Sequence, residues 1–330
     1  MMVVVFTRAM VRYVSKVLPG LGVKGVPVLT AADWFSRRRR KVIPGLPKKY
    51  NQETPDLITR FKKHPVMLEA ARMFVARQIV ETTADMARRL EGVSRGEEVL
   101  GRWEELRRKH AAPMPRIRAL RDWVGQQDLG GAFARQRVAT ALHLAVSRLG
   151  DVAGDWAEML TDQDLLAAAV DRCSPGEFSM AQIQRLTRWV SDQLGPDGLA
   201  SASASAPAPA DPDAPMANPD NSPYISLDGR DERIQEEGGR LDLTDDPLLL
   251  YFALLKEGCL RPRGKAAIRY EHLVIDEAQD LSAVELKVLL SCTSKLRSIT
   301  LTGDTAQRTV FDNGFSDWAS ALERVGEQGA

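Results

Sequence analysis

The sequence predicts an α/β protein in which a parallel β-sheet is interrupted by a long all-helical region. Both ends of the chain have a strand–helix–strand pattern, and this pattern favours parallel pairing because adjacent parallel strands need a crossover helix between them. Between these ends, residues 64–194 keep a helical period without any strand-like alternation. Together these observations predict one sheet with a helical insertion.

The N-terminal unit begins with "VVVFT", a continuous apolar run that is typical of a buried parallel strand. "VPVLTAADWF" predicts a short second strand that leads into a helix. Residues 37–63 are basic, with "RRRRKVIPGLPKKY" followed by "RFKK", and we expect irregular structure there. Between the two strands, a helix is predicted from the spacing of Met10, Tyr13, Val14, Val17 and Leu18.

The middle of the chain divides into a helical part and a linker. "PVMLEAARMFVARQIVETTADMARRLE" and four later segments predict helices across residues 64–194, which we interpret as a helical subdomain inserted into the α/β domain. Residues 195–223 contain seven prolines and almost no large apolar side chain. Such a segment cannot bury enough surface to become ordered, so residues 195–240 are predicted to be a disordered linker.

The C-terminal part, residues 241–330, repeats the strand–helix–strand pattern after one further helix. "DLTDDPLLLYFALLKEG" predicts a helix with an acidic first turn and Gly258 at its end. "IRYEHLVID" and "RSITLTGD" predict strands that end at Asp276 and Asp304, and Ser282 is expected to cap the helix between them. Ligands bind outside the carboxyl ends of parallel strands, so these two carboxylates predict a site.

Composition limits the class of protein. The chain has 330 residues, of which 44% are hydrophobic and 27% charged, as expected for a globular protein that is not embedded in a membrane. Three cysteines lie far apart without metal spacing, which predicts a reducing, cytoplasmic location. Residues 1–110 carry 23 Lys and Arg against 11 Asp and Glu, and the remainder carries 22 against 33. This asymmetry predicts either an anionic partner for the first part or only solvated helix faces.

The acidic motif at the end of the predicted strand suggests a specific chemistry. A carboxylate at a strand exit can hold Mg²⁺ while the phosphates of a nucleotide supply other ligands. A second, adjacent carboxylate can orient a water against the terminal phosphate. Asp276 and Glu277 provide this pair, and Gln307 supplies an uncharged donor after the second strand.

These residues resemble a known family. "LVIDEAQDLS" resembles motif II of the UvrD/Rep branch of superfamily 1 helicases, and "TLTGDTAQRT" resembles motif III. "VVVFTRAMVRYVSKVLPGLGVKGVPVLTAADW" is similar to the segment that carries motif Ia. The segments closest to the HelD-like subgroup are "YVSKVLPGLGV" and "DLTDDPLLLYFALLKEG" together with "YEHLVIDEAQDLSAVEL". The resemblance covers residues 3–36 and about 241–322, and it implies a P-loop-NTPase-like (RecA-like) motor domain with a helical subdomain between residues 64 and 194.

The resemblance implies a role for each matching residue. Asp276 would bind Mg²⁺, and Glu277 would be the general base for ATP hydrolysis. Gln279 and Asp280 would link nucleotide state to the neighbouring motifs. Gln307 would sense the γ-phosphate, and Asp304 would support its loop. The residues at positions that meet DNA are Thr7, Arg8 and Thr30. For Arg8, a solvated cation at a helix start is an equal alternative to a phosphate contact.

Parts of the family pattern are missing from the sequence. The nearest match to a phosphate-binding loop is "GCLRPRGKA", Gly258 to Ala266, which has one residue too many between its glycines and Ala266 in place of a metal-ligating hydroxyl. The family's loop lies upstream of motif Ia, and we expected its strand near the centre of the sheet, so that its absence would expose an apolar groove. The second motor domain and its arginine finger are also missing, so the isolated chain is expected to be inactive as an enzyme.

Two functions remain open from the sequence. The first is an ATP-dependent helicase or translocase that moves on single-stranded or partly duplex DNA, with ATP and Mg²⁺ as cofactors. The second is a non-catalytic module that binds nucleic acid or, as the HelD-like resemblance implies, RNA polymerase. Arg37–Lys41 could contact phosphates or lie in a solvated loop. The aromatic residues that could stack on bases or belong to a core are Phe311, Phe315 and Trp318.

Overall fold

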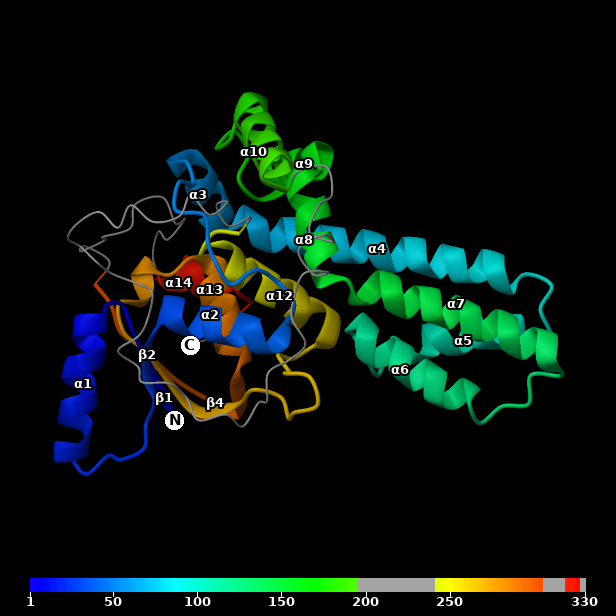
Figure 1. Ribbon diagram of the computed structural model, residues 1–330, viewed down its shortest axis with the longest axis horizontal. Helices are drawn as coiled ribbons and strands as arrows, with labels where there is room; N and C mark the ends of the chain where they lie inside the picture. Colours follow the sequence, from blue (N-terminus) through cyan, green and yellow to red (C-terminus); the bar gives the residue numbers. More distant parts are fainter. Residues whose placement is uncertain (195–240, 305–317, 327–330) are drawn as a thin grey trace.

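The fold is built around a four-stranded parallel sheet with the strand order β2-β1-β3-β4 (Figure 1). The computed structural model describes residues 1–194, 241–304 and 318–326. The strands are β1 (Met2–Val5), β2 (Val28–Thr30), β3 (Tyr270–Ile275) and β4 (Thr293–Leu301). The predicted α/β class and the parallel pairing between the two ends of the sequence are therefore confirmed.

The centre of the sheet has no vacant position. β1 and β3 are direct hydrogen-bonded neighbours, with Met2 opposite Leu273 and Val4 opposite Ile275. The expectation that the absence of the phosphate-loop strand leaves a groove at the centre of the sheet is therefore wrong. The pairing is favoured because all four residues of β1 are apolar and buried, as in a central parallel strand, and β3 contributes Leu273, Val274 and Ile275 beside it.

The two faces of the sheet are covered by different helices. On the outer face, α1 (Arg8–Gly20) packs over Val3, Val5 and Val28. On the inner face, Val4 and Ile275 belong to the main core. The inner helices that contribute to this core are α2 (Ala31–Val42), α12 (Asp245–Glu257) and α13 (Ala283–Ser291). α1 and α13 lie on opposite faces because their right-handed crossovers run in opposite directions across the sheet.

The basic segment after β2 is more regular than expected. α2 continues through the arginine run as far as Val42, and a second helix, α3, covers Asp56–Lys63. The expectation of irregular structure was therefore wrong for residues 37–42 and 56–63 and is confirmed for residues 43–55. Arg37–Lys41 do not form a loop, although Arg37, Arg40 and Lys41 are exposed on the helix. Thr30 caps α2 by accepting a hydrogen bond from the backbone of Asp33, and Trp34 is buried in the main core. This cap and this anchor hold the arginine run in helical form.

The helical region between β2 and β3 contributes to two separate hydrophobic cores. Its helices are α4 (Val66–Leu90), α5 (Gly96–Leu106), α6 (Pro113–Val124), α7 (Ala132–Gly150), α8 (Val152–Thr161), α9 (Gln163–Cys173) and α10 (Met180–Leu194). The end of α4 packs with α5, α6 and α7 around Trp103 in a core of their own. The start of α4 and α8 to α10 belong to the main core with the sheet. Figure 1 shows the first group extending away from the sheet.

Buried ion pairs join α12 to the basic N-terminal part of the chain. Arg39 Nε lies 2.8 Å from Asp246 Oδ1, and both side chains are almost fully buried. Lys62 Nζ lies 2.7 Å from Asp242 and 2.6 Å from Asp245. Part of the charge asymmetry of the sequence is therefore used inside the molecule. The prediction of an anionic partner for the first part stays a prediction.

The acidic cluster around Lys62 has perturbed ionisation. Burial raises the pKa of Asp245 to about 7, although the Lys62 ammonium opposes this shift. Trp156 Nε1 donates to Asp245 at 3.2 Å, and the backbone N–H of Asp242 donates at 2.8 Å. Two buried carboxylates therefore share one ammonium and a small set of neutral donors.

Among the described residues, no helix is both long and apolar enough to cross a membrane. Trp318 begins α14 (Trp318–Arg324) and packs against the main core, which agrees with the core alternative for this residue. Phe311 and Phe315, like the predicted linker 195–240, lie outside the described residues.

Replacing Arg39 should destabilise the fold much more than replacing its neighbour Arg37. Arg39→Met leaves the buried carboxylate of Asp246 without its cation, which should lower the free energy of unfolding by about 3–5 kcal/mol. Arg37 is exposed on the same helix, so Arg37→Met should change it by at most about 0.5 kcal/mol. Urea denaturation followed by circular dichroism measures both, and equal effects would contradict the buried ion pair.

Replacing Lys62 should produce a pH-dependent loss of stability. In Lys62→Met, Asp242 and Asp245 remain buried without the ammonium. Asp245 has an ordinary pKa of 3.8 when unfolded and, with Lys62 in place, a pKa of about 7 when folded; Lys62→Met removes the cation that opposes this rise. Between these values the folded state binds more protons, so the stability that this group contributes falls as pH rises.

We therefore expect Lys62→Met to lose more unfolding free energy at pH 8 than at pH 5, measured by thermal unfolding in matched buffers. Lys63→Met, at the adjacent and more exposed position, is the control and should show no such difference. A loss that is equal at both pH values would show that the carboxylates do not take up a proton.

Candidate functional site

The predicted site residues lie at the carboxyl edge of the sheet. Thr30 ends β2, Thr7 follows β1, and Asp276 follows β3 directly. The sequence predicted Asp304 as the last residue of β4. The strand ends earlier, at Leu301, so Asp304 belongs to the segment that follows it. Asp304 is exposed. Gln307, the predicted phosphate sensor, lies outside the described residues.

The chain is held firmly where it leaves β3. The backbone N–H of Asp276 donates to Val4 O at 2.9 Å, which extends the pairing with β1. On the other side, Thr302 N donates to Ile275 O at 2.9 Å, and Ala278 N donates to Thr302 O at 3.0 Å. These bonds fix the backbone of the acidic motif between two neighbouring strands.

The Asp276 side chain is half-buried and oriented by one hydroxyl. Thr302 Oγ1 donates to Asp276 Oδ1 at 2.6 Å. Sequence reasoning missed Thr302, although a threonine at the end of the next strand is a position from which a hydroxyl can reach this carboxylate. A carboxylate with one oriented oxygen and partial access to solvent fits a Mg²⁺ ligand, because Mg²⁺ keeps several waters and takes only one or two protein carboxylates.

A metal ion here would need most of its ligands from outside the chain. Within residues 1–194, 241–304 and 318–326, no group of three or more His, Cys, Asp or Glu side chains could hold a metal. Asp276 alone is a weak site, so the phosphate oxygens of a nucleotide would have to complete the coordination.

Glu277 has an unusual backbone conformation. Its φ of 51° and ψ of 42° place it in the left-handed region, which residues with a side chain rarely adopt. Its side chain is exposed, and Gln279 Nε2 donates to Glu277 Oε2 at 2.6 Å. Such strain persists where the surroundings enforce it and is concentrated at functional sites.

Gln279 and Asp280 lie in a short 3₁₀ helix, η1 (Ala278–Asp280), directly after Glu277. Both side chains are buried. Gln279 lies tightly against Gly303, where an added Cβ would overlap the Gln279 Oε1 atom. Gln279 therefore joins Glu277 to the segment after β4, which is the arrangement that a link between the two motifs requires.

Three of the predicted residues have local structural roles. Thr7 Oγ1 accepts from Met10 N at 3.2 Å and caps α1, and Thr30 caps α2. Arg8 lies 3.3 Å from Asp33 in an ion pair that is partly exposed. These contacts account for the residue types at these positions and leave the predicted DNA contacts untested.

Glu285, in the first turn of α13, has a structural role of the same kind. Its carboxylate accepts from the backbone of Ser282 at 2.8 Å, and the Ser282 hydroxyl accepts from Glu285 N at 3.2 Å. This reciprocal pair is a capping box, and it confirms Ser282 as the predicted cap of α13.

The glycine-rich segment from Gly258 to Ala266 is not placed to bind phosphates at this edge. It connects the end of α12 to β3 and therefore lies at the amino end of that strand. Asp276 lies at the other end, about 20 Å away for a strand of this length. Gly258 adopts a φ of 73° as the C-terminal cap of α12, which explains the glycine without a ligand.

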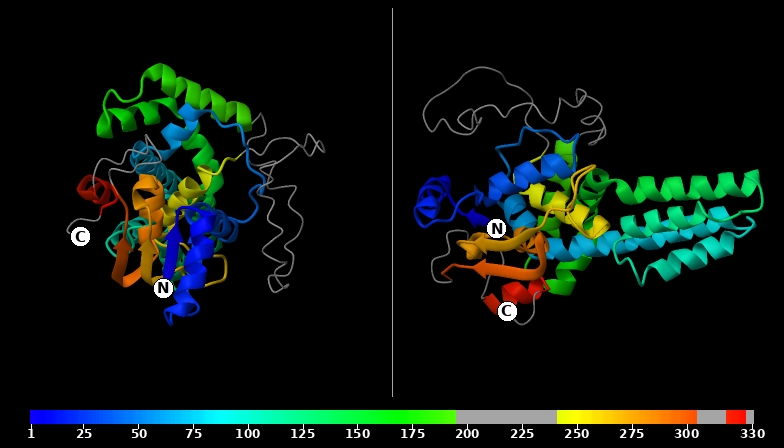
Figure 2. Two further views of the ribbon diagram at one scale, coloured as in Figure 1. Left: turned by 90° about the vertical axis from the view of Figure 1, so that its left-hand side faces the viewer. Right: turned by 90° about the horizontal axis from the view of Figure 1, so that it is seen from below.

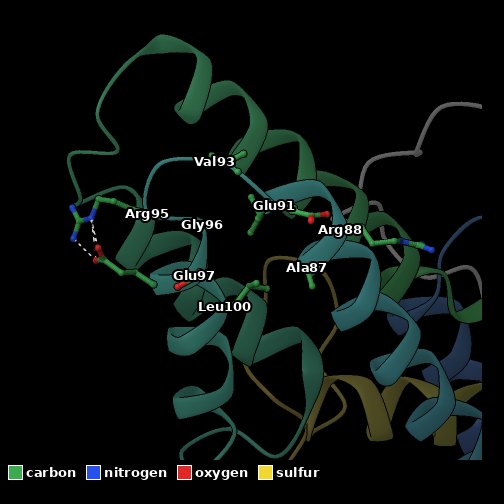
Figure 3. Close-up of a pocket in the computed structure, with 11 residues that line it drawn as sticks. Ala87, Arg88, Glu91, Val93, Arg95, Gly96, Glu97 and Leu100 are labelled. Carbon is green, nitrogen blue, oxygen red and sulfur yellow. Dashed lines mark hydrogen bonds and ion pairs between the residues drawn. The ribbon is translucent and has the colours of Figure 1, made fainter.

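A pocket of about 660 Å³ lies far from the carboxylates, between the end of α4 and the start of α5 (Figure 3). Arg95 Nη2 lies 2.6 Å from Glu98 Oε2 at its rim, and Arg95 also donates to the carbonyl of Asp128 at 2.8 Å. These contacts connect α5 to the loop after α6 and do not form a site with the predicted residues.

No known family model matches the chain, and no curated protein matches it either. The proposed relationship to helicases therefore depends on the quoted motifs and on the chemistry of this edge.

Adding a methyl group at Gly303 should disturb the acidic motif. Gly303→Ala forces the buried Gln279 side chain away from Glu277, which should lower the free energy of unfolding by about 1–3 kcal/mol. The control is Gly101→Ala in α5, where an added Cβ meets nothing within 4 Å. This control should be slightly stabilising, because alanine favours a helix. Chemical denaturation measures both, and a stabilised Gly303→Ala would contradict the close approach.

Proposed function

We propose that the chain is part of the motor domain of an ATP-dependent DNA helicase or translocase of the UvrD/Rep type, from the HelD-like branch. The observation that carries this proposal is the pair of carboxylates after β3, where Asp276 is oriented by Thr302 and Glu277 is held in a left-handed conformation. The parallel sheet supports a RecA-like domain, and the helices between β2 and β3 support an inserted helical subdomain.

Each residue of the motif has a chemical role in this proposal. Asp276 would hold Mg²⁺, and bound Mg²⁺·ATP would supply the phosphate to be hydrolysed. Glu277 is exposed beside it and would accept a proton from the attacking water. Gln279 bridges Glu277 to the segment after β4, so it would transmit changes at the nucleotide to Asp304 and Gln307.

Nucleic acid would bind at the same carboxyl edge of the sheet, beside β1 and β2. Thr7, Arg8 and Thr30 lie after β1 and β2, next to the carboxylates in the order of the sheet. Arg8 is bound to Asp33 through a partly exposed ion pair, which a DNA phosphate could replace because exposed ion pairs contribute little to stability.

A second candidate function follows from the absence of a phosphate cradle. Among the described residues, no glycine-rich loop lies at the carboxyl edge of the sheet, so ATP would be held weakly. The chain would then act as a non-catalytic module that binds nucleic acid or RNA polymerase.

Mg²⁺·ATP binding separates the two candidates. With Mn²⁺ as a paramagnetic probe, we expect weak binding of Mn²⁺·ATP in the millimolar range that Asp276→Asn reduces by about tenfold or more. Electron paramagnetic resonance of free Mn²⁺ measures this affinity. ATP hydrolysis should stay at background with or without single-stranded DNA, because the described residues form no cradle for the phosphates.

The control variant is Glu271→Gln, an exposed carboxylate near the amino end of the same strand, which should bind Mn²⁺·ATP as the unchanged chain does. If Asp276→Asn binds equally well, or if no binding occurs, the helicase proposal fails. Retained binding of single-stranded DNA in that case would favour the non-catalytic module.

A further inference from the structure

A pocket of about 470 Å³ lies between α6 and α7, away from the sheet. The end of α4, with α5, α6 and α7, forms a helical lobe that has its own hydrophobic core and extends away from the sheet (Figure 2, right). The pocket, which we call the α6–α7 pocket, is lined only by residues of these two helices and of the loop between them. Its volume is large enough for a small organic molecule.

The floor of the α6–α7 pocket is apolar. Leu129 and Leu142 are buried in the core of the helical lobe, and Val124 and Val146 pack against that core. The residues that α7 contributes, at the spacing of one helix face, are Arg135, Ala139, Leu142, His143 and Val146. Because this face extends over roughly 16 Å of helix, the pocket is elongated.

The rim of the α6–α7 pocket carries basic side chains. Arg121 comes from α6, and Arg135 and His143 come from α7. All three side chains are exposed, and none of the residues that line the pocket is acidic. Among the described residues, these three side chains form no ion pair. The rim therefore offers two guanidinium groups and an imidazole to a ligand.

Other arginines of the same helices are bound within the chain. Arg116 Nη2 in α6 lies 3.0 Å from Glu104 Oε1, and Arg148 Nη2 in α7 lies 3.1 Å from Glu158 Oε2. The pocket is thus a place where the cations of the helical lobe are not neutralised by its own carboxylates. A guanidinium group can donate two parallel hydrogen bonds to one carboxylate or phosphate, so an anionic group of a ligand would complete this rim.

The loop that closes one end of the pocket is held in place by hydrogen bonds. Arg95 Nη1 donates to Asp128 O at 2.8 Å, and Arg95 Nη2 donates to Gln127 Oε1 at 3.4 Å. The backbone N–H of Gly130 donates to Asp128 Oδ1 at 3.1 Å. Gln127 and Leu129 of this loop line the pocket. A ligand would therefore bind without first ordering the loop, which lowers the entropic cost of binding.

We propose that the α6–α7 pocket binds an elongated amphipathic anion, in which an apolar chain ends in a carboxylate or a phosphate. The chain lies along the aliphatic floor at Leu129, Leu142 and Val146, and the anionic head group accepts hydrogen bonds from the guanidinium groups of the rim. The inference does not depend on the proposed function, because the walls come only from residues 121–146 and include no residue of the sheet.

Two other kinds of ligand fit less well. Nucleic acid would bring phosphates to the arginines, but its bases stack best on aromatic rings, whereas the floor of this pocket is aliphatic. A neutral or cationic apolar molecule would fill the floor but leave the basic rim without a partner. Only an anion with an apolar chain matches both the floor and the rim.

Isothermal titration calorimetry with a set of simple amphiphiles tests the proposal. We expect the full chain to bind decanoate with submillimolar affinity, below the concentration at which micelles form. Decyltrimethylammonium has the same chain and the opposite charge, and it should bind at least about tenfold more weakly. Hexanoate has the same head group and should also bind at least about tenfold more weakly, because its shorter chain buries less apolar surface.

The head group and the basic rim are tested by two further measurements. Decyl phosphate should bind as well, and whichever of decyl phosphate and decanoate binds more tightly identifies the head group. The double variant Arg121→Gln with Arg135→Gln should lose the preference for decanoate over decyltrimethylammonium, because the guanidinium groups supply that preference.

Two neighbouring variants in α7 locate the binding. Ala139→Glu adds a carboxylate to the lining of the pocket and should weaken decanoate binding by about tenfold or more. Thr140→Glu, at the next position of the helix and outside the lining, is the matched control and should bind as the unchanged chain does. Because both positions are exposed, circular dichroism should show both variants folded.

Three results would overturn the proposal: no binding of decanoate below its micelle concentration, equal affinity for decanoate and decyltrimethylammonium, or equal weakening by Ala139→Glu and Thr140→Glu. Binding of a DNA oligonucleotide that Ala139→Glu abolishes, in a chain that does not bind decanoate, would assign the pocket to nucleic acid instead.

Discussion

The structure depends most on the buried ion pairs between the start of α12 and the basic residues of α2 and α3. Lys62 and Arg39 together contact three carboxylates within five positions of the chain, Asp242, Asp245 and Asp246. Removing one partner of a buried pair is costly because the remaining charge has no compensation. These contacts therefore allow only one placement of α12, whose apolar side chains form the centre of the main core.

The position of α12 determines the geometry of the candidate site through the sheet. α12 packs against α2, which follows β2, and against α13, which follows β3. β3 can then lie directly beside β1, and the backbone of Asp276 continues that pairing by its bond to Val4. The strained turn at Glu277 is stable because the ladder on one side and the tight contact between Gln279 and Gly303 on the other leave it no relaxed alternative.

The two faces of the sheet differ in how fully helices cover them. The inner face is covered by α2, α12 and α13 and is continuous with the helical region, whereas the outer face has α1 over β1 and β2 only. The outer residues of β3 and β4 are largely polar, so their exposure costs less than exposure of an apolar face would. Exposed apolar side chains occur on both elements: Tyr13 in α1 is 64% exposed and Leu296 in β4 is 83% exposed.

The sequence by itself determined the α/β class, the parallel pairing, the caps at Ser282 and Gly258 and the carboxylates at the end of β3. Each of these follows from local pattern, because hydrophobic period, cap residues and strand exits are encoded by neighbouring positions. Helix α2 was predicted to end too early because an arginine run looks solvated when its partner is unknown. The partner, Asp246, lies 207 positions later in the sequence.

Only the tertiary structure decided the features that depend on residues distant in sequence. These include the direct pairing of β1 with β3, the left-handed Glu277, the hydroxyl of Thr302 on Asp276 and the division of the helical region between two cores. The physical reason is the same in each case. Burial and hydrogen bonding between distant segments select one arrangement from several that the local sequence allows equally.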